Sequence, residues 1–267
     1  CAASAGILAN ALWAAVLGGS SQTDGETGLS LQVFPGGDVS LSGISRSADF
    51  PTTPGVAKPV TSGPPDAFVA RIAASGSTLM YATLAGGTGT DAAEHRHALR
   101  SDGTVFLTGV TQSTNLPGAI NAHAGGDDGF VVQVAPDASQ FLRVRYLGGS
   151  GQEHVLGPVV DNAGLIYLFG STNSPDFPVT TDALQRTLAG GHDGVLAILN
   201  PDFSLRYATY LGGNGDELVR GAAVDANGDV YLIGRTGSAN FPVSAGAFQR
   251  TYGGGTDDGF VLKLKAP

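Results

Sequence analysis

The sequence predicts an all-β fold, a closed four-bladed β-propeller with four antiparallel strands in each blade. Three signals predict it, because each occurs four times in the same order at steps of about 61 to 68 residues. They are a Leu-Gly-Gly or Leu-Ala-Gly-Gly motif, an aromatic residue or leucine before proline, and an Asp two residues before an apolar run. The motifs start at Leu17, Leu84, Leu147 and Leu211, the proline pairs at Phe50, Leu116, Phe177 and Phe241, and the aspartates are Asp66, Asp128, Asp193 and Asp258.

Short apolar runs bounded by turn residues predict the strands within each copy. In the fourth copy, residues 221–224 and 230–233 are joined by a turn that ends in Asn227-Gly228. An Asn-Gly pair tolerates the positive φ angles of a tight hairpin. In the third copy, a turn around Pro201 separates the last two strands. Each unit therefore supplies four antiparallel strands, which make up one propeller blade.

The phase of the repeat predicts how the ring closes. Residues 11–17 correspond to a fourth strand, and residues 260–264 correspond to a third strand. We expect the N-terminal strand to join the last blade, because a closed ring leaves no exposed edge. The alternative is an open solenoid with two apolar ends. The predicted boundaries are 1–10 for a tether and 11–267 for one propeller domain, with repeat units of about 18–85, 86–147, 148–211, and 212–267 plus 11–17.

These motifs resemble the bacterial β-propeller repeat family called SBBP. The matching segments are Tyr207–Gly213, Ala223–Asp225 with Gly228, Asp49–Gly55 and Asp66–Ala70. The resemblance covers nearly the whole chain after about residue 11. It implies a secreted or surface-exposed propeller, but it implies no common activity. The second copy departs most from the pattern, since it lacks the first-strand Asp and is shorter after Leu116-Pro117.

Charge and composition argue against two classes of partner. The formal net charge is -9 and charged residues make up only 14% of the chain. Phosphate binding needs clustered Lys and Arg, so we expect no nucleic-acid partner. No apolar stretch approaches the roughly 18 to 20 residues that span a bilayer. We therefore expect the propeller itself to lie in water.

The single cysteine, Cys1, stands before Ala2, Ala3 and Ser4. This arrangement resembles the start of a bacterial lipoprotein after cleavage of its signal peptide. Acylation of Cys1 would anchor the chain stably to a membrane. We therefore expect an extracytoplasmic location, on the periplasmic side or the outer-membrane surface of a Gram-negative-type bacterium. The alternative is a chain boundary that falls on cysteine by chance.

Most of the acidic residues fall in the long loops, which share one face of a propeller, and basic residues gather towards the opposite face. We expect the acidic face to bind protein partners and the basic rim to face anionic headgroups, with solvated strand ends as the alternative for the rim. The predicted interaction face comprises Asp127, Asp128, Glu153, Asp193, Asp216, Glu217, Asp257 and Asp258. The predicted membrane-side rim comprises Arg71, Arg143, Arg145, Arg206, Lys263 and Lys265.

The most specific pattern for metal chemistry is the pair His95 and His97. Alternate residues of a strand share a face, so the two imidazoles could bind one Zn²⁺ with Asp91 or His123 as a third ligand. The alternative is a polar pair at the mouth of the channel. The loop carboxylates could bind Ca²⁺, but they lack a calcium-loop pattern. An Asp before each third strand more simply accepts backbone N–H bonds that fix the long loop. No cofactor is required.

No catalytic pattern stands out, since a Gly-x-Ser-x-Gly elbow is absent from the sequence. The leading prediction is a non-catalytic, lipid-anchored propeller that serves as a protein-interaction or scaffold module. One form of it is an extrinsic subunit of a respiratory, photosynthetic or outer-membrane complex. A carbohydrate- or metal-binding surface lipoprotein is the second interpretation, and a hydrolase is the third.

Overall fold

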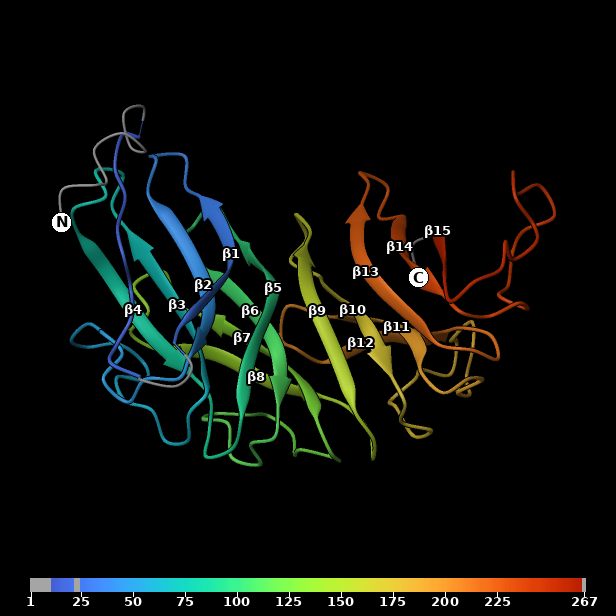
Figure 1. Cartoon of the computed structure of the whole chain (residues 1–267), viewed down its shortest axis with the longest axis horizontal. Helices are drawn as coiled ribbons and strands as arrows, with labels where there is room; N and C mark the ends of the chain where they lie inside the picture. The colour runs from blue at the N-terminus through green and yellow to red at the C-terminus, as the bar shows by residue number, and fades with distance from the viewer. Residues whose placement is uncertain (1–10, 22–24, 266–267) are drawn as a thin grey trace.

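Every regular element in the computed structural model, which describes residues 11–21 and 25–265, is a β-strand (Figure 1). The first sheet contains β1 (Thr27–Val33), β2 (Val39–Ser45), β3 (Asp66–Ile72) and β4 (Leu79–Ala85). The second contains β5 (Asp91–Leu99), β6 (Val105–Thr111), β7 (Asp128–Val134) and β8 (Phe141–Leu147). The third contains β9 (Glu153–Val160), β10 (Ile166–Thr172), β11 (Asp193–Leu199) and β12 (Leu205–Leu211). The last contains β13 (Glu217–Val224), β14 (Val230–Thr236) and β15 (Asp258–Leu264).

Within each sheet, consecutive strands pair in antiparallel fashion. The pair β10 and β11 runs from Ile166 opposite Leu199 to Thr172 opposite Asp193 without a shift. The first strand of every sheet contains a bulge where it pairs with the second strand. In β5 the bulge lies between Ala93 and His97. The strict alternation that the His-x-His pattern assumes is therefore interrupted at that point.

The hairpin between β13 and β14 forms as the Asn-Gly pair predicts. Gly228 has a φ of +83°, a conformation that a residue with a Cβ rarely adopts. The Asp225 carboxylate accepts hydrogen bonds from the N–H groups of Asn227 and Asp229, at 2.9 and 3.0 Å. The turn residues therefore set the register of these two strands.

The core lies between the sheets. Three apolar clusters fill the junctions from the first sheet to the last. They include Val69, Tyr81, Leu107 and Phe130 in the first junction, Val131, Leu147, Leu168 and Val195 in the second, and Phe169, Leu196, Val230 and Leu232 in the third. Full burial of one such aliphatic or aromatic side chain stabilises a fold by about 1.5–3 kcal/mol. Sheet-on-sheet packing therefore fixes how each sheet sits on the next.

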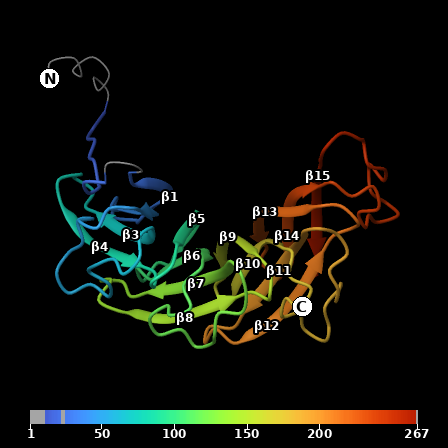
Figure 2. The same ribbon diagram turned by 60° about the horizontal axis from the view of Figure 1, so that its bottom comes forward.

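The four sheets follow one another along an arc (Figure 2). The first strands β1, β5, β9 and β13 line its concave side, and the fourth strands β8 and β12 lie on the convex side. The first sheet lies at one end and the last sheet at the other in both views. The described residues contain no helix that is long and apolar enough to cross a bilayer.

The predicted closure by the N-terminal strand is not what the structure contains. Among the described residues no sheet is closed, and the last sheet has three strands, with β15 paired to β14. Residues 11–17 form no strand. Trp13 Nε1 instead donates a hydrogen bond to Ala74 O, at 3.0 Å, in the turn between β3 and β4. The segment therefore lies against the first sheet, because the arc holds the last sheet away from it.

Candidate functional site

Each junction contains two buried carboxylates beside the first glycine of a Gly-Gly motif. The pairs are Asp66 with Asp91, Asp128 with Glu153, and Asp193 with Glu217, and none is more than 2% exposed. A Cβ added at Gly148 would lie 2.4 Å from both Asp128 Oδ1 and Glu153 Oε2. A side chain cannot fit at that distance, which explains why the motif requires glycine.

Hydroxyl groups hold one carboxylate of each pair. Glu153 accepts hydrogen bonds from the Thr172 hydroxyl at 2.5 Å, from the Ser174 hydroxyl, and from the Gly149 N–H at 3.0 Å. Asp91 is held in the same way by Thr111, Ser113 and the Gly87 N–H. The Thr-x-Ser segment that provides these hydroxyls recurs at the end of the second strand, a signal in the sequence that the motif analysis missed.

The other carboxylate of each pair fixes the long loop, as predicted for the Asp before the third strand. Asp193 accepts hydrogen bonds from the N–H groups of Ala189 and Gly190, at 2.9 and 3.0 Å. Asp128 accepts one from the Ala124 N–H at 2.8 Å. Burial raises the pKa of Asp91, Asp128, Glu153 and Asp193. These groups are structural links between sheets.

The three junctions differ in which side chain binds the carboxylate at the start of the third strand. In the first, Lys58 Nζ lies 3.0 Å from Asp66 Oδ2. In the third, Gln185 Nε2 donates to Asp193 Oδ2 at 2.6 Å. In the second, Asn121 bonds to the backbone of Tyr146 instead, and Asp128 Oδ1 has no hydrogen-bond partner. Asp66 Oδ1 in the first junction also has no hydrogen-bond partner, but the other oxygen of Asp66 binds a lysine, whereas the other oxygen of Asp128 accepts a backbone N–H.

The predicted acidic interaction face is wrong for half of its members. Asp128, Glu153, Asp193 and Glu217 are buried between sheets and cannot present their charge to a partner. The sequence did not indicate this burial. Each of these four carboxylates is the first residue of a strand and directly follows a loop, so the sequence assigned it to the loop. The other four, Asp127, Asp216, Asp257 and Asp258, are half-buried or exposed. They bind within the loops: Asp127 with Gln112 and Gln152, Asp216 with His192, Asp257 with Arg235, and Asp258 with Gly253.

His97 is buried, and its Nδ1 lies 3.0 Å from the Ser42 hydroxyl. Burial lowers its pKa to about 4, so it is neutral at physiological pH. His123 Nε2 lies 3.3 Å from Thr111 O, and both Asp91 oxygens accept hydroxyl hydrogen bonds. Among the described side chains, which do not include that of His95, no group of three His, Cys, Asp or Glu is placed to hold a metal ion. The metal site stays a prediction, as does Cys1, which lies outside the described residues.

Most members of the predicted basic rim have partners within the chain. Arg71 binds Asp38 at 2.6 Å and covers the Phe34 ring. Lys263 binds Asp229 at 2.8 Å, and the bond raises the pKa of that lysine. Arg145 donates to Phe203 O and Arg143 to Gln133 Oε1. Arg206 and Lys265 are exposed. The rim is thus partly neutralised by neighbouring groups.

The last sheet exposes apolar side chains at positions that are buried in the other sheets. Val261 in β15 is 67% exposed, whereas Val131 and Leu196, its equivalents in β7 and β11, are fully buried. Ile233 in β14 is 54% exposed, whereas its equivalent Phe169 is fully buried in the third junction. The face that would pack against a following sheet is therefore uncovered.

The first sheet is uncovered at the opposite end of the arc. Leu31 and Val33 of β1 are exposed. Their equivalents in β13, Ala222 and Val224, are partly buried against the third sheet. The two end surfaces thus correspond to the two sides of an internal junction.

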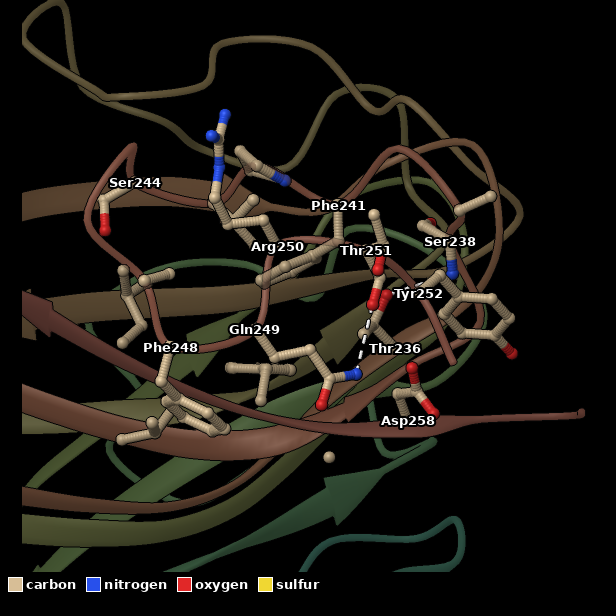
Figure 3. A pocket seen from close by; sticks show the side chains of 18 of the residues that line it. Thr236, Ser238, Phe241, Ser244, Phe248, Gln249, Arg250, Thr251, Tyr252 and Asp258 are labelled. Atoms are coloured by element: carbon tan, nitrogen blue, oxygen red, sulfur yellow. Dashed lines mark hydrogen bonds between the residues drawn. The ribbon is translucent and has the colours of Figure 1, made fainter. Parts of the chain in front are cut away.

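A pocket of about 430 Å³ lies at the free edge of β15, between that strand and the loop of residues 238–252 (Figure 3). Phe248 in this loop is exposed, and Gln249 Nε2 donates to Thr251 O at 3.1 Å. In the third sheet, the equivalent Gln185 binds the fourth strand: its N–H donates to Thr209 Oγ1 at 3.0 Å and its O accepts from the Tyr210 N–H at 3.2 Å. The pocket therefore occupies the place that a fourth strand fills elsewhere.

A family model described as a beta-propeller repeat, SBBP, matches residues 206–242. This segment runs from β12 through β14, and the match confirms the resemblance inferred from the repeat motifs. No curated protein matches the chain. The chain is thus an all-β protein that contains a β-propeller repeat.

Proposed function

We propose that this chain is a non-catalytic protein-interaction module and that its two end sheets are the interacting surfaces. The observation that carries the proposal is the exposure of Ile233 and Val261 at positions that are buried in every internal junction. Uncovered apolar surface of this kind favours association, because its removal from water contributes about 25 cal/mol per Å². The association that covers these faces also completes a closed propeller ring, whether from the four sheets of one chain or with sheets of a partner.

The proposal includes a lipid anchor at Cys1 and an extracytoplasmic location. The small residues Ala2, Ala3 and Ser4 after the cysteine support it. On this proposal the partners belong to a membrane-associated assembly, in which a rigid, sheet-packed module supplies structure. Purification of the native chain in mild detergent, with identification of its modified N-terminus by mass spectrometry, tests both parts.

A pair of matched substitutions tests the interaction surface. Val261 and Val60 are equally exposed, at 67%, but Val60 lies in the loop between β2 and β3. It belongs neither to the free edge of β15 nor to the exposed surface of β1 that contains Leu31 and Val33. We expect Val261→Asp to abolish copurification of the partner and Val60→Asp to leave it unchanged. Equal loss in both variants, or loss in neither, contradicts the assignment of the surface.

A further inference from the structure

We infer that the partner of the end sheets is a second copy of this chain, whose residues 11–17 add to β15 as the missing fourth strand. The inference rests on the proposed function and names the occupant of the same surface. The described residues of each copy include both halves of the contact, a three-stranded sheet that ends at β15 and a segment, residues 11–17, that belongs to no sheet. Two arcs joined head to tail at both ends form one ring of eight sheets, within the size range of known propellers.

The sequence of the segment fits the vacant strand. Residues 11–19 align without a gap to residues 205–213, the fourth strand of the third sheet and its Gly-Gly motif. Trp13 stands where Tyr207 stands, and Leu17 stands where Leu211 stands. Val16 replaces Tyr210, but the fourth strand of the first sheet has Leu84 at that position and buries it fully. An apolar side chain at this position is therefore compatible with a blade.

The segment already lies on the first sheet in the manner of a fourth strand from a preceding blade. Leu17 packs with Phe68 and Leu84, as Leu211 packs with Val230 and Leu232 of the last sheet. The Ser20 N–H donates to Asp49 Oδ1 at 2.7 Å. The equivalent Asn214 N–H donates to Asn240 Oδ1 at 2.8 Å, where β12 leads into the last sheet.

The outward side of the segment is open. Leu12 and Val16 are fully exposed. The equivalent of Leu12 in β12, Arg206, is also exposed, but the equivalent of Val16, Tyr210, is fully buried. The Tyr210 hydroxyl accepts from the Phe177 N–H and donates to Ser174 O. One side of the segment therefore packs on the first sheet of its own chain, and the other side is free to pair with a strand of another sheet.

The last sheet offers the complementary edge. The register of β11 with β12 pairs Leu196 with Thr209 and Ile198 with Tyr207. The same register places Val261 opposite Ala15, and Lys263 opposite Trp13. The pocket beside β15, with Gln249 in the position of Gln185, receives the strand. A donated strand satisfies the free edge of β15, as strand addition does in other sheets.

A second copy can dock without changing the arc, whereas the chain's own segment cannot. Residues 11–17 and β15 lie at opposite ends of the arc in both views (Figures 1 and 2). To join them within one chain, all three packed junctions would have to shift, and packed interiors resist such shifts. A head-to-tail contact is heterologous, so it closes only when the rotation of two arcs completes a ring.

Cysteine cross-linking of the chain tests the inference. In a Cys1→Ser background, one variant carries Ala15→Cys and another carries Val261→Cys. We expect a disulfide-linked dimer when the two variants are mixed under oxidation, at twice the 26.9 kDa of one chain. A mixture of the Ala15→Cys and Val60→Cys variants is the matched control and should stay monomeric. Circular dichroism of each variant confirms that it is folded.

The outcomes separate the inference from the proposed function. If a chain with both Ala15→Cys and Val261→Cys forms the disulfide within one copy, the ring closes by itself and the inference is overturned. If wild-type chain sediments as a monomer while Val261→Asp still abolishes binding of another protein, the inference fails and the proposed function stands. The mass of the wild-type chain requires no substitution, so it decides the case even if a variant does not fold.

Discussion

The internal junctions and the ends of the arc are built from the same repeat, yet only the junctions are complete. Leu196 in β11 and Val261 in β15 occupy equivalent positions, and the first is buried while the second is 67% exposed. The difference comes from the neighbouring sheet and not from the strand itself. A repeat of this kind cannot bury its apolar face alone, so each end of an array needs a cover.

The largest effect is expected at a junction glycine. Gly148→Ala places a Cβ against both Asp128 and Glu153, and we expect it to reduce the free energy of unfolding by about 3–5 kcal/mol, the range of severe core defects. Gly246→Ala is the control, since no atom lies within 4 Å of the added Cβ. Chemical denaturation of both variants measures the difference. A small effect at Gly148 would mean that the junction is loosely packed.

The comparison between Leu196 and Val261 can be measured directly. Leu196→Ala should reduce the free energy of unfolding by about 2–5 kcal/mol, as for other buried leucines. Val261→Ala should cost less than about 0.5 kcal/mol in dilute, monomeric protein, because surface substitutions rarely cost more. A second copy would raise the cost at Val261 as the protein concentration increases. Equal costs at low concentration would show that β15 is covered within one chain.

Removal of a hydroxyl group at a junction should reduce the free energy of unfolding by less than the loss of a buried leucine does. Ser174→Ala removes a hydrogen bond to the buried Glu153 carboxylate, and we expect a loss of about 1–3 kcal/mol because a buried charged acceptor loses a donor. Ser204→Ala, which removes an exposed hydrogen bond to Asp202, should cost much less. Thermal unfolding followed by circular dichroism compares the two.

The smallest effect is expected to be a gain in stability. Asp128 Oδ1 has no hydrogen-bond partner, and both it and Glu153 Oε2 lie 2.4 Å from the position of a Cβ on Gly148. Asp128→Asn would therefore place an amide donor on the side of Asp128 that is nearest to Glu153. We expect a gain of about 1 kcal/mol at pH 7, in the range of a net hydrogen bond. Asp66→Asn is the contrasting variant. Asp66 Oδ1 also lacks a partner, but Asp66 Oδ2 forms an ion pair with Lys58, so the loss of charge should make this variant destabilising.

The pH dependence of this gain follows from the raised pKa values of Asp128 and Glu153. When folding raises the pKa of a carboxyl, the folded state binds its proton more tightly than the unfolded state does. The stability that this group contributes is fully present below its unfolded pKa, near 4, and it is lost as the pH rises through the folded pKa. Asp128→Asn removes one of these groups. The gain should therefore be larger at pH 7 than at pH 4, and an equal gain at both values would contradict the account.

The repeat motifs predicted the sheets, the hairpin turns and the role of Asp128 and Asp193 in holding the long loops. They did so because turn chemistry and strand pairing are local. The burial of Glu153 and Glu217 could not be predicted in this way, since it depends on the packing of one sheet on the next. Ring closure is not confirmed either: the match of residues 11–17 to a fourth strand is a local pattern, and it does not determine where the packing of the sheets places that segment.

Hydrogen exchange of residues 11–17 and of β15 tests the central claim most directly. If a second copy supplies the fourth strand, the amide groups of both segments are protected at high protein concentration, and protection falls together on dilution or in Val261→Asp. Rapid exchange of both segments at every concentration would contradict the account, and so would protection that does not depend on concentration.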